Sequence, residues 1–412
     1  MQKLEDAVIP MKNNLNIITD TQMNSFKGLS NIPPLEVFSI EVIDYLNQLS
    51  KSLFKDKRSR EYPDVSTFAF FCRKANITAL KKQHSKNDHI RLGKGVVFHI
   101  APSNVPVNFA YSLIAGLLSG NVNIVRVPSK DFEQIQIIVE AINKISQEKK
   151  YILFSKRIIL VRYDNKYEEI TKEISSICNA RVIWGGDSTI DSIRKHKLHP
   201  RASDLTFSDR YSLCIINADK LAKEEKLDPI IEGFYNDTYL FDQNACTSPH
   251  LIVWQGSKKN VDKSQTLFWG KLHELVKEKY NLQPIHAVDK LTDFYDQSIG
   301  MKDLKILDKN DNLLWRIRLN SLDVNIENFR SNCGYFCEYH ATSFMEIASI
   351  ANTKYQTLSY YGFTQNELTN FISTETPFGI DRIVPIGKTM DFSLFWDGHD
   401  LINSLSRTVE VI

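Results

Sequence analysis

Cys246 is the cysteine of this sequence whose surroundings best suit catalysis. It lies in the polar segment Phe241-Asp-Gln-Asn-Ala-Cys-Thr-Ser-Pro-His250, just before an apolar run. A nucleophilic cysteine needs solvent access and polar neighbours that hold the thiolate. A structural cysteine usually lies within an apolar run, as Cys214 does in Leu213-Cys-Ile-Ile. Cys246 is therefore the candidate nucleophile, with an inert loop thiol as the alternative.

The histidines and remaining cysteines give weaker signals. His250 follows Cys246 by four residues, which makes a cysteine–histidine hydrolase pair an alternative, but this spacing does not by itself direct the imidazole at the sulfur. His99 stands in an apolar run, which favours packing over catalysis. Cys333 and Cys337 form a C-x3-C that no second cysteine or histidine pair supports, so no metal site is expected.

Polar or glycine-rich residues follow three apolar runs in the first half of the chain. In a parallel sheet, ligands bind beyond the carboxyl ends of the strands, and helix N-termini that follow such ends favour phosphate. The candidate ligand-binding residues at these ends are Ser103, Arg126, Pro128, Ser129, Lys130, Gly185 and Gly186. The motif G-x-G-x-x-G is absent, so ordinary loops are the alternative.

The elements that must position these residues alternate between strands and helices. The first half has predicted strands at 95–101, 123–127, 157–163, 181–184 and 204–207, and helices at 105–119, 131–148, 166–176 and 187–197. Ser129 is the predicted N-cap of the second helix. The second half has predicted strands at 212–217, 250–254 and 356–363, and helices at 229–236, 262–280 and 343–352. This alternation predicts an α/β fold with parallel sheets.

The length of 412 residues predicts two or three domains. Residues 1–90 are polar and mostly helical in pattern, and we expect them to join a first α/β half over residues 91–209. Residues 210–412 are then a second α/β half.

Charge and composition exclude several classes of protein. The net charge of +2 gives no support to a nucleic-acid role. No apolar run reaches the ~18–20 residues of a membrane span. The N-terminus lacks the cationic-then-apolar order of a signal peptide, and the 6 scattered cysteines are typical of a reduced protein. We therefore expect a cytoplasmic protein.

Five segments carry a family resemblance: Gly93-Lys-Gly-Val-Val-Phe-His-Ile-Ala-Pro-Ser-Asn-Val-Pro-Val-Asn, Leu118-Ser-Gly-Asn-Val-Asn-Ile-Val-Arg-Val-Pro-Ser-Lys, Val182-Ile-Trp-Gly-Gly-Asp, Gln243-Asn-Ala-Cys-Thr-Ser-Pro and Gly379-Ile-Asp-Arg-Ile-Val-Pro-Ile-Gly-Lys. In this order they resemble the fatty acyl reductase of bacterial luminescence, the LuxC family. The first ninety residues match it poorly. That family belongs to the aldehyde dehydrogenase superfamily, so the resemblance implies an aldehyde-dehydrogenase-like fold. It implies a Rossmann-type, NAD(P)-binding cofactor domain over residues 91–209, which residues 1–90 join, and an α/β catalytic domain over residues 210–412 with a C-terminal return or oligomerisation segment.

The resemblance also implies roles for particular residues. Pro102-Ser-Asn-Val-Pro106 is similar to the segment whose asparagine helps form the oxyanion hole, which implies Asn104 in that role beside Cys246. Val127-Pro-Ser129 resembles the segment beside the adenosine ribose. Trp184-Gly-Gly186 lies where the superfamily's Gly-Ser turn approaches the cofactor.

Two departures from the superfamily pattern affect the expected reaction. Phe207-Ser-Asp-Arg-Tyr-Ser-Leu stands where the superfamily has Glu-Leu-Gly-Gly-Lys, and it contains no glutamate to activate a hydrolytic water. This favours exchange of the acyl group with a thiol over exchange with water. Lys130 stands where many NAD-dependent members carry a ribose-binding glutamate, and Lys130 and Arg126 would attract the 2′-phosphate of NADP.

The resemblance thus implies an NADPH-dependent reductase. It would convert a fatty acyl thioester, carried by coenzyme A or by an acylated partner synthetase, to the aldehyde through an acyl-cysteine. It would form a homo-oligomer. The alternatives are a reductase of acyl phosphate or an acyl carrier, an ordinary aldehyde dehydrogenase, a cysteine acyltransferase or hydrolase without nicotinamide, and a catalytically silent binding module.

Overall fold

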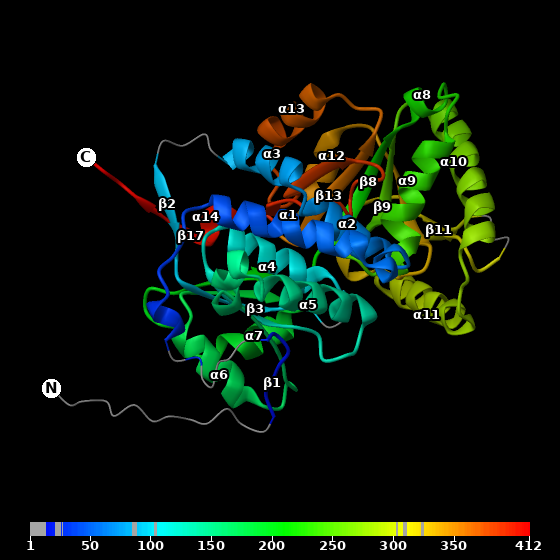
Figure 1. Ribbon diagram of the computed structural model, residues 1–412. Coiled ribbons are helices and arrows are strands. Elements are labelled where there is room, and N and C mark those ends of the chain that lie inside the picture. Colours follow the sequence, from blue (N-terminus) through cyan, green and yellow to red (C-terminus); the bar gives the residue numbers. More distant parts are fainter. Residues whose placement is uncertain are drawn as a thin grey trace. The chain divides into compact units, whose positions relative to one another are not determined.

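The structure is a computed structural model, and it describes residues 14–20, 26, 28–84, 89–102, 105–301, 304–307, 311–322 and 325–412. The chain divides into two compact units. Unit 1 comprises residues 1–208 together with 399–412, and unit 2 comprises residues 209–398. Figure 1 shows the elements of both.

Unit 1 contains eight helices and nine strands among its described residues. The helices are α1 (Ile40–Lys55), α2 (Pro63–Phe71), α3 (Lys74–His84), α4 (Asn108–Leu118), α5 (Glu133–Ser146), α6 (Glu168–Ile177), α7 (Asp187–Arg194) and α14 (Leu401–Ser404). The strands are β1 (Asn16–Ile17), β2 (Ile90–Gly93), β3 (Val96–Ile100), β4 (Val122–Arg126), β5 (Ile158–Arg162), β6 (Ala180–Trp184), β7 (Ser203–Phe207), β16 (His399–Asp400) and β17 (Ser406–Val409).

The main sheet of unit 1 has the strand order β1-β5-β4-β3-β6-β7. All neighbours are parallel except β1, which runs antiparallel to β5. The chain runs outward from β3 through β4 to β5, and then returns to the other side of β3 to form β6 and β7. This is the order of a Rossmann-type half, and the direction reverses between β3 and β6. The buried residues of β3, β4 and β5 form a core with α6 and α7.

The C-terminal segment of the chain belongs to unit 1. Strand β17 pairs antiparallel with β2, with Ser406 opposite Gly93. The Asn121 amide donates to the Leu405 carbonyl at 2.8 Å, and the Arg91 guanidinium donates to the Ser406 hydroxyl at 2.8 Å. These contacts hold β17 beside β2, the strand that precedes β3 of the main sheet.

Unit 2 contains six helices and eight strands among its described residues. The helices are α8 (Ala218–Leu221), α9 (Asp228–Thr238), α10 (Lys258–Lys279), α11 (Pro284–Gly300), α12 (Phe344–Ile350) and α13 (Gln365–Glu375). The strands are β8 (Tyr211–Asn217), β9 (Pro249–Gln255), β10 (Lys305–Ile306), β11 (Trp315–Arg318), β12 (Tyr335–Ala341), β13 (Tyr355–Tyr361), β14 (Arg382–Pro385) and β15 (Phe395–Trp396).

The main sheet of unit 2 has the order β10-β11-β12-β9-β8-β13-β14. Only β10 runs antiparallel to its neighbour. Helices α9 and α10 pack on one face, where Phe234 and Phe268 are fully buried. Helices α12 and α13 pack on the other face through Ile347 and Phe371. The central strands β8 and β9 are therefore covered on both faces, as parallel sheets require.

The predicted α/β class is confirmed, and the predicted elements occur within a few residues of their expected bounds. The expectation that Ser129 caps a helix is wrong. Helix α5 begins at Glu133 with Phe132 as its N-cap residue, so Ser129 and Lys130 lie in the loop before it. The sequence pattern did not predict α11, α13, β12 or β14.

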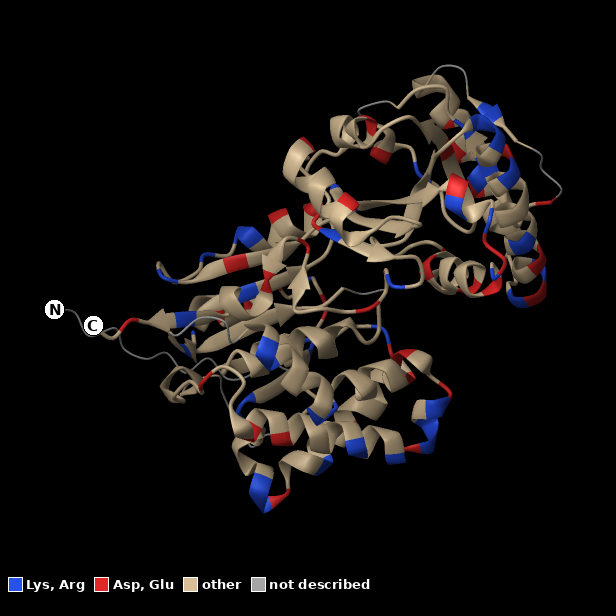
Figure 2. Cartoon of the chain, turned by 90° about the horizontal axis from the view of Figure 1, so that it is seen from above, with Lys and Arg blue, Asp and Glu red and all other residues tan. Residues whose placement is uncertain are grey.

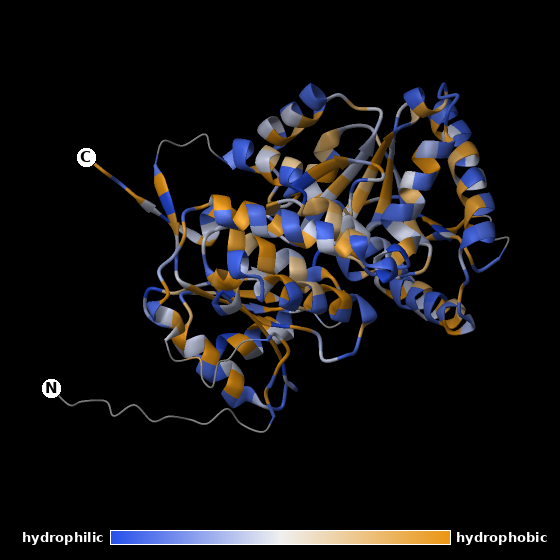
Figure 3. Ribbon diagram, viewed as in Figure 1, coloured by the Kyte–Doolittle hydropathy of each residue, from blue (hydrophilic) through white to orange (hydrophobic). Residues whose placement is uncertain are grey.

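The distribution of polar and apolar residues agrees with this arrangement. Figure 2 shows lysine and arginine interspersed with aspartate and glutamate along the helices. Figure 3 shows apolar residues along the strands, whereas most helices carry both hydrophilic and hydrophobic residues. Among the helices that the structure describes, none combines the length and the hydropathy needed to cross a membrane.

Candidate active site

The loop that carries Cys246 is anchored by a buried glutamine. Its first residues, Asp242 and Gln243, have left-handed φ angles of 52° and 60°. The Gln243 amide nitrogen donates to the carbonyls of Pro249 and Tyr335, both at 3.0 Å. Its amide oxygen accepts from the backbone N–H groups of Gly334 and Tyr335 at 3.0 and 3.1 Å. Because all these partners are backbone groups at the ends of β9 and β12, the loop is held at a fixed place on the sheet.

The backbone of Cys246 is held by residues of two neighbouring strands, β8 and β13. The Ser212 hydroxyl, at the start of β8, donates to the Cys246 carbonyl at 2.6 Å, and it accepts from the Thr357 N–H of β13 at 3.2 Å. Cys246 is the exposed cysteine, and the other five are buried. The exposure that the polar loop indicates is thus confirmed.

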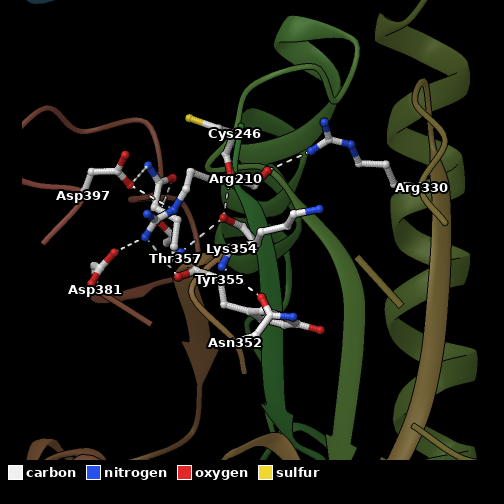
Figure 4. Close-up of polar contacts among 11 residues, drawn as sticks. Arg210, Cys246, Arg330, Asn352, Lys354, Tyr355, Thr357, Asp381 and Asp397 are labelled. Carbon is white, nitrogen blue, oxygen red and sulfur yellow. Dashed lines mark hydrogen bonds and ion pairs between the residues drawn. The ribbon is translucent and has the colours of Figure 1, made fainter. Parts of the chain in front are cut away.

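Two carboxylates and an arginine form a cluster beside this cysteine, which we call the Arg210 cluster (Figure 4). The Arg210 guanidinium donates to the Asp381 carboxylate, and its Nε lies 3.3 Å from Asp397 Oδ1. It also donates to the Tyr355 carbonyl at 3.2 Å. The Gln356 amide donates to Asp397 Oδ1 at 2.7 Å. With Gln356, the cluster therefore consists of Arg210, Gln356, Asp381 and Asp397, which come from four separate segments of unit 2.

The surroundings of the Cys246 sulfur favour the thiol over the thiolate. Although Cys246 is exposed, desolvation of its sulfur by neighbouring groups raises the pKa of the thiol to about 11. The negative charge of Asp397 raises the pKa further. The Gln356 side chain and the positive charge of Arg210 act in the opposite direction. At neutral pH the resting residue is therefore protonated, which differs from the thiolate-holding setting that the sequence indicates.

The pH dependence of alkylation should report this protonated state. We expect the rate of iodoacetamide labelling of Cys246 to rise about tenfold per pH unit from pH 7 to 10, without levelling near the ~8.5 of an ordinary cysteine. Asp397→Asn should shift the profile to lower pH because it removes a negative charge. Peptide mass spectrometry measures labelling at each pH. A wild-type profile that levels between pH 8 and 9 would contradict the raised pKa.

The alternative of a cysteine–histidine pair finds no support in the position of His250. Its Nδ1 lies 3.1 Å from the Ser331 carbonyl, and its ring stacks on Tyr211 at 5.8 Å between centroids. Burial lowers the pKa of His250 to about 3. His99 is packed, as expected: it is fully buried between the Ser112 hydroxyl at 2.7 Å and the Asn123 amide oxygen at 3.0 Å.

The two predicted cofactor-binding cations of unit 1 have different environments. Arg126, at the end of β4, donates to the Tyr163 carbonyl at 3.3 Å and to the Asn165 side chain, and its guanidinium lies 4.5 Å from the Tyr163 ring. Lys130 is exposed, with its ammonium 5.1 Å from the Phe132 ring. Since Arg126 is already engaged, Lys130 is the cation more available to a ligand.

The other predicted cofactor residues lie at carboxyl ends of parallel strands. Pro128 is buried and Ser129 exposed in the loop after β4. Gly185 and Gly186 follow β6 and are partly exposed, and Gly186 is the N-cap residue of α7 without a side-chain cap. Ser103 and Asn104 lie outside the described residues. Within the described ranges, no three His, Cys, Asp or Glu side chains come together to hold a metal.

Sequence reasoning missed the Arg210 cluster. Arg210 lies in the segment that was singled out for its missing glutamate, but nothing in the spacing marks it as a neighbour of Cys246. Gln356 gave one usable signal, since it is a polar residue within a predicted buried strand. Asp381 and Asp397 gave no such signal, because both lie in connections whose course depends on the fold, Asp381 just before β14 and Asp397 in the turn after β15.

Comparison with known proteins identifies the family. The sequence profile described as acyl-CoA reductase (LuxC) matches residues 75–409. A long-chain acyl-protein thioester reductase of Vibrio harveyi is 24% identical over 322 residues, which are 77% of this chain and 64% of that protein. A long-chain acyl-protein thioester reductase 2 of Photobacterium leiognathi is 27% identical over 173 residues, 41% of this chain and 34% of that protein. The chain thus spans less than two thirds of the length of these relatives.

Solved structures show the same fold. Lactaldehyde dehydrogenase from Escherichia coli superposes with a TM-score of 0.60 at 12% identity, over 90% of this chain and 86% of that one. Glyceraldehyde-3-phosphate dehydrogenase GapN from Methanocaldococcus jannaschii, solved with NADP, gives 0.59 at 16% identity, over 90% and 88%. The predicted aldehyde-dehydrogenase-like fold is confirmed, and since the profile match covers most of the sequence, this chain belongs to the LuxC family of acyl-CoA reductases.

Proposed function

We propose that the chain reduces a fatty acyl thioester to the aldehyde with NADPH, through an acyl-cysteine on Cys246. The observation that carries the proposal is the exposed Cys246 on its anchored loop, in a chain with the fold of aldehyde dehydrogenases. The relatives from Vibrio harveyi and Photobacterium leiognathi, named long-chain acyl-protein thioester reductases, support the reaction class.

The acylation step uses groups of this chain. The Cys246 thiol loses its proton, the sulfur bonds to the acyl carbon, and the carbon–sulfur bond to the departing thiol breaks as that thiol takes up a proton. The backbone N–H of Cys246 is a donor for the transient oxyanion, and we retain Asn104 as the predicted second donor; one good donor contributes roughly 3–4 kcal/mol. Because Ser212 fixes the Cys246 carbonyl, the orientation of the peptide groups around the nucleophile is set before the acyl group arrives.

The residues of unit 1 fit a nicotinamide dinucleotide. The sheet reverses direction between β3 and β6, and dinucleotides bind beyond the carboxyl ends of strands at such a point. Gly185 and Gly186 leave the backbone open at the N-terminus of α7, where free N–H groups favour phosphate. Lys130 would meet the 2′-phosphate of NADP, beside Pro128 and Ser129. When bound, NADPH would supply a hydride to the acyl carbon, and the carbon–sulfur bond to Cys246 would then break to release the aldehyde and, with one proton taken up, the Cys246 thiol.

Changing Lys130→Glu should lower the preference for NADPH over NADH by about tenfold or more, because a carboxylate repels the 2′-phosphate. The comparison is the kcat/KM for each nucleotide, together with the rise in melting temperature that each one causes. Lys144→Glu, at an exposed position in the last turn of α5, is the matched charge control. An unchanged preference in Lys130→Glu would remove Lys130 from the cofactor site.

The donor of the acyl group is the finer part of the proposal. Coenzyme A thioesters and an acylated partner synthetase are both candidates, and the names of the relatives favour an acyl-protein. A homo-oligomer and a cytoplasmic location stay predictions. The test compares tetradecanoyl-CoA, short acyl-CoA and acyl phosphate with NADPH, with aldehyde measured by gas chromatography. Aldehyde from the long-chain thioester supports the proposal, whereas free acid without NADPH oxidation would favour a cysteine hydrolase.

A further inference from the structure

The loop over residues 386–391 follows β14 and contacts the loop that carries Cys246. It begins within residues 379–388, one of the segments that resemble the LuxC family. The Thr247 hydroxyl donates to Met390 Sδ at 3.3 Å. Because Thr247 directly follows Cys246 in the chain, the place of this loop affects the place of the proposed nucleophile.

Two backbone N–H groups of the 386–391 loop converge on one buried carboxylate. Asp237, on α9, is 1% exposed. Its Oδ2 accepts from the Gly387 N–H at 2.6 Å, and its Oδ1 accepts from the Thr389 N–H at 3.1 Å. The helix and the loop come this close because a glycine stands on each side: a Cβ on Gly233 would lie 3.0 Å from the Gly387 Cα. Gly233 precedes Asp237 by four residues, so both lie on the same face of α9.

The carbonyl groups of the same loop converge on a guanidinium. Arg382, the first residue of β14, donates to the carbonyls of Lys388, Thr389 and Asp391 at 3.1, 2.7 and 2.6 Å. The loop is thus held by its N–H groups on one side and by its carbonyl groups on the other. Partly buried networks of this kind favour one backbone geometry, since any other leaves charged groups without partners.

Asp237 also contacts the loop of Cys246 through its own backbone. The Asp237 carbonyl accepts from the Ser248 hydroxyl at 2.7 Å. The Ser248 N–H in turn donates to the Ala245 carbonyl at 2.9 Å, which closes a turn around Cys246. The backbone of Asp237 therefore holds Ser248, and its side chain holds the loop that contacts Thr247. A change of the side chain removes only the second of these contacts.

We propose that Asp237 is a positioning residue for the acylation of Cys246: its carboxylate holds the 386–391 loop so that Met390 keeps Thr247, and with it the Cys246 sulfur, in place for attack. This rests on the proposed acyl-cysteine. Attack requires the sulfur and the acyl carbon about 3–3.5 Å apart and correctly aligned, and a misplacement of about 1 Å can cost on the order of 10²-fold in rate.

The test measures acylation in single turnovers without nucleotide. The protein is mixed with increasing tetradecanoyl-CoA, and mass spectrometry gives the maximal rate of acylation and the half-saturating concentration. Asparagine offers one acceptor and one donor to the two N–H groups that the Asp237 carboxylate binds. We expect Asp237→Asn to lower the maximal rate about 10–100-fold and to change the half-saturating concentration by less than about threefold.

The same chemical change at the other end of α9 is the matched control. Asp228 is the first residue of this helix, and its side chain is 84% exposed. Asp228→Asn should acylate at the wild-type rate. Melting temperatures of all variants identify any that has lost its fold.

A double-mutant cycle tests whether Asp237 acts through Met390. Met390→Ala removes the contact to Thr247 and should lower the maximal rate about threefold or more. Combined with Asp237→Asn, it should be no more than about twofold slower than Asp237→Asn alone, because both changes break the same connection. If Asp237→Asn does not fold, Asp237→Glu takes its place in the cycle, since it keeps both acceptor oxygens but moves them by one methylene group.

The outcomes separate this inference from the proposed function. If wild type forms no adduct on Cys246, the acyl-cysteine itself is wrong. If wild type forms the adduct and a folded Asp237→Asn reaches the same maximal rate, the role of Asp237 is wrong. A raised half-saturating concentration at an unchanged maximal rate would also overturn it, because Asp237 would then act on substrate binding. Losses that multiply in the double variant would show that Asp237 does not act through Met390.

Discussion

Cys246→Ala is expected to abolish aldehyde formation, with a loss on the order of 10³-fold or more in kcat, because it removes the thiol that carries the acyl group in the proposed reaction. The loss should occur without unfolding. The residue is exposed, and what the sheet holds is its backbone carbonyl, which alanine retains. We therefore expect the free energy of unfolding to change by no more than about 0.5 kcal/mol. Steady-state kinetics and chemical denaturation measure the two quantities.

A second cysteine is the matched control for this variant. Cys214 lies on β8 and is fully buried. Cys214→Ala should lower the free energy of unfolding by about 1 kcal/mol and leave aldehyde formation largely intact. Cys246→Ala should thus lose activity and keep its stability, whereas Cys214→Ala should lose stability and largely keep its activity. Substantial activity in Cys246→Ala would show that the reaction does not use this thiol.

Glu338→Ala is expected to lower the free energy of unfolding of unit 2 by about 3–5 kcal/mol, because it breaks a buried ion pair and leaves several donors without a partner. Glu338 lies on β12 and is 1% exposed. One carboxylate oxygen accepts from the indole N–H groups of Trp254 and Trp269 at 2.7 and 2.8 Å and from the Gln265 amide at 2.9 Å. The other accepts from Arg316 Nε at 2.6 Å.

The same residues provide the measurement. Trp254 and Trp269 both donate to Glu338, so their fluorescence reports the unfolding of this part of unit 2 in urea. Glu274→Ala, at an exposed position on α10, is the matched control and should change stability by no more than about 0.5 kcal/mol. A Glu338→Ala midpoint equal to that of wild type would show that the carboxylate is not needed to satisfy these donors.

The strands that carry the site could be predicted from the sequence because their residues are apolar on both faces. Val96–Ile100 is buried at every position, and Tyr211–Asn217 at all but its last. Continuous apolar runs of this kind indicate parallel strands covered by helices. The polar loop of Cys246 was recognisable for the same reason, since it interrupts such a pattern. Local composition was enough to predict that Cys246 is exposed, and its role as the nucleophile stays a prediction.

The charged and polar neighbours of Cys246 could not be predicted in this way. The Arg210 cluster forms only because β8, β13 and β14 pair side by side and because the chain turns sharply at Asp397. Its members are Arg210, Gln356, Asp381 and Asp397. Their spacing in the sequence follows neither the period of a helix nor that of a strand. The state of the Cys246 thiol depends on these charges, so a loop composition that indicates a thiolate is not sufficient.

Helix α11 shows a second limit of sequence patterns. Its large apolar residues Ile285, Val288, Tyr295 and Ile299 are 57–86% exposed, whereas Lys290 and Gln297 are each 1% exposed. The Lys290 ammonium donates to the Asn312 carbonyl at 2.6 Å, and Gln297 accepts from the Tyr335 hydroxyl at 2.5 Å. The usual assumption that the apolar face of a helix is the buried face would orient this helix the wrong way round.

The most direct test of an acyl-cysteine on Cys246 is the mass of the protein after incubation with tetradecanoyl-CoA in the absence of NADPH. We predict one tetradecanoyl group per chain, located by peptide mapping on the peptide that contains Cys246, lost on addition of NADPH and absent from Cys246→Ala. An unmodified Cys246 peptide, or an acyl group on another residue that still forms aldehyde, would contradict the proposed reaction.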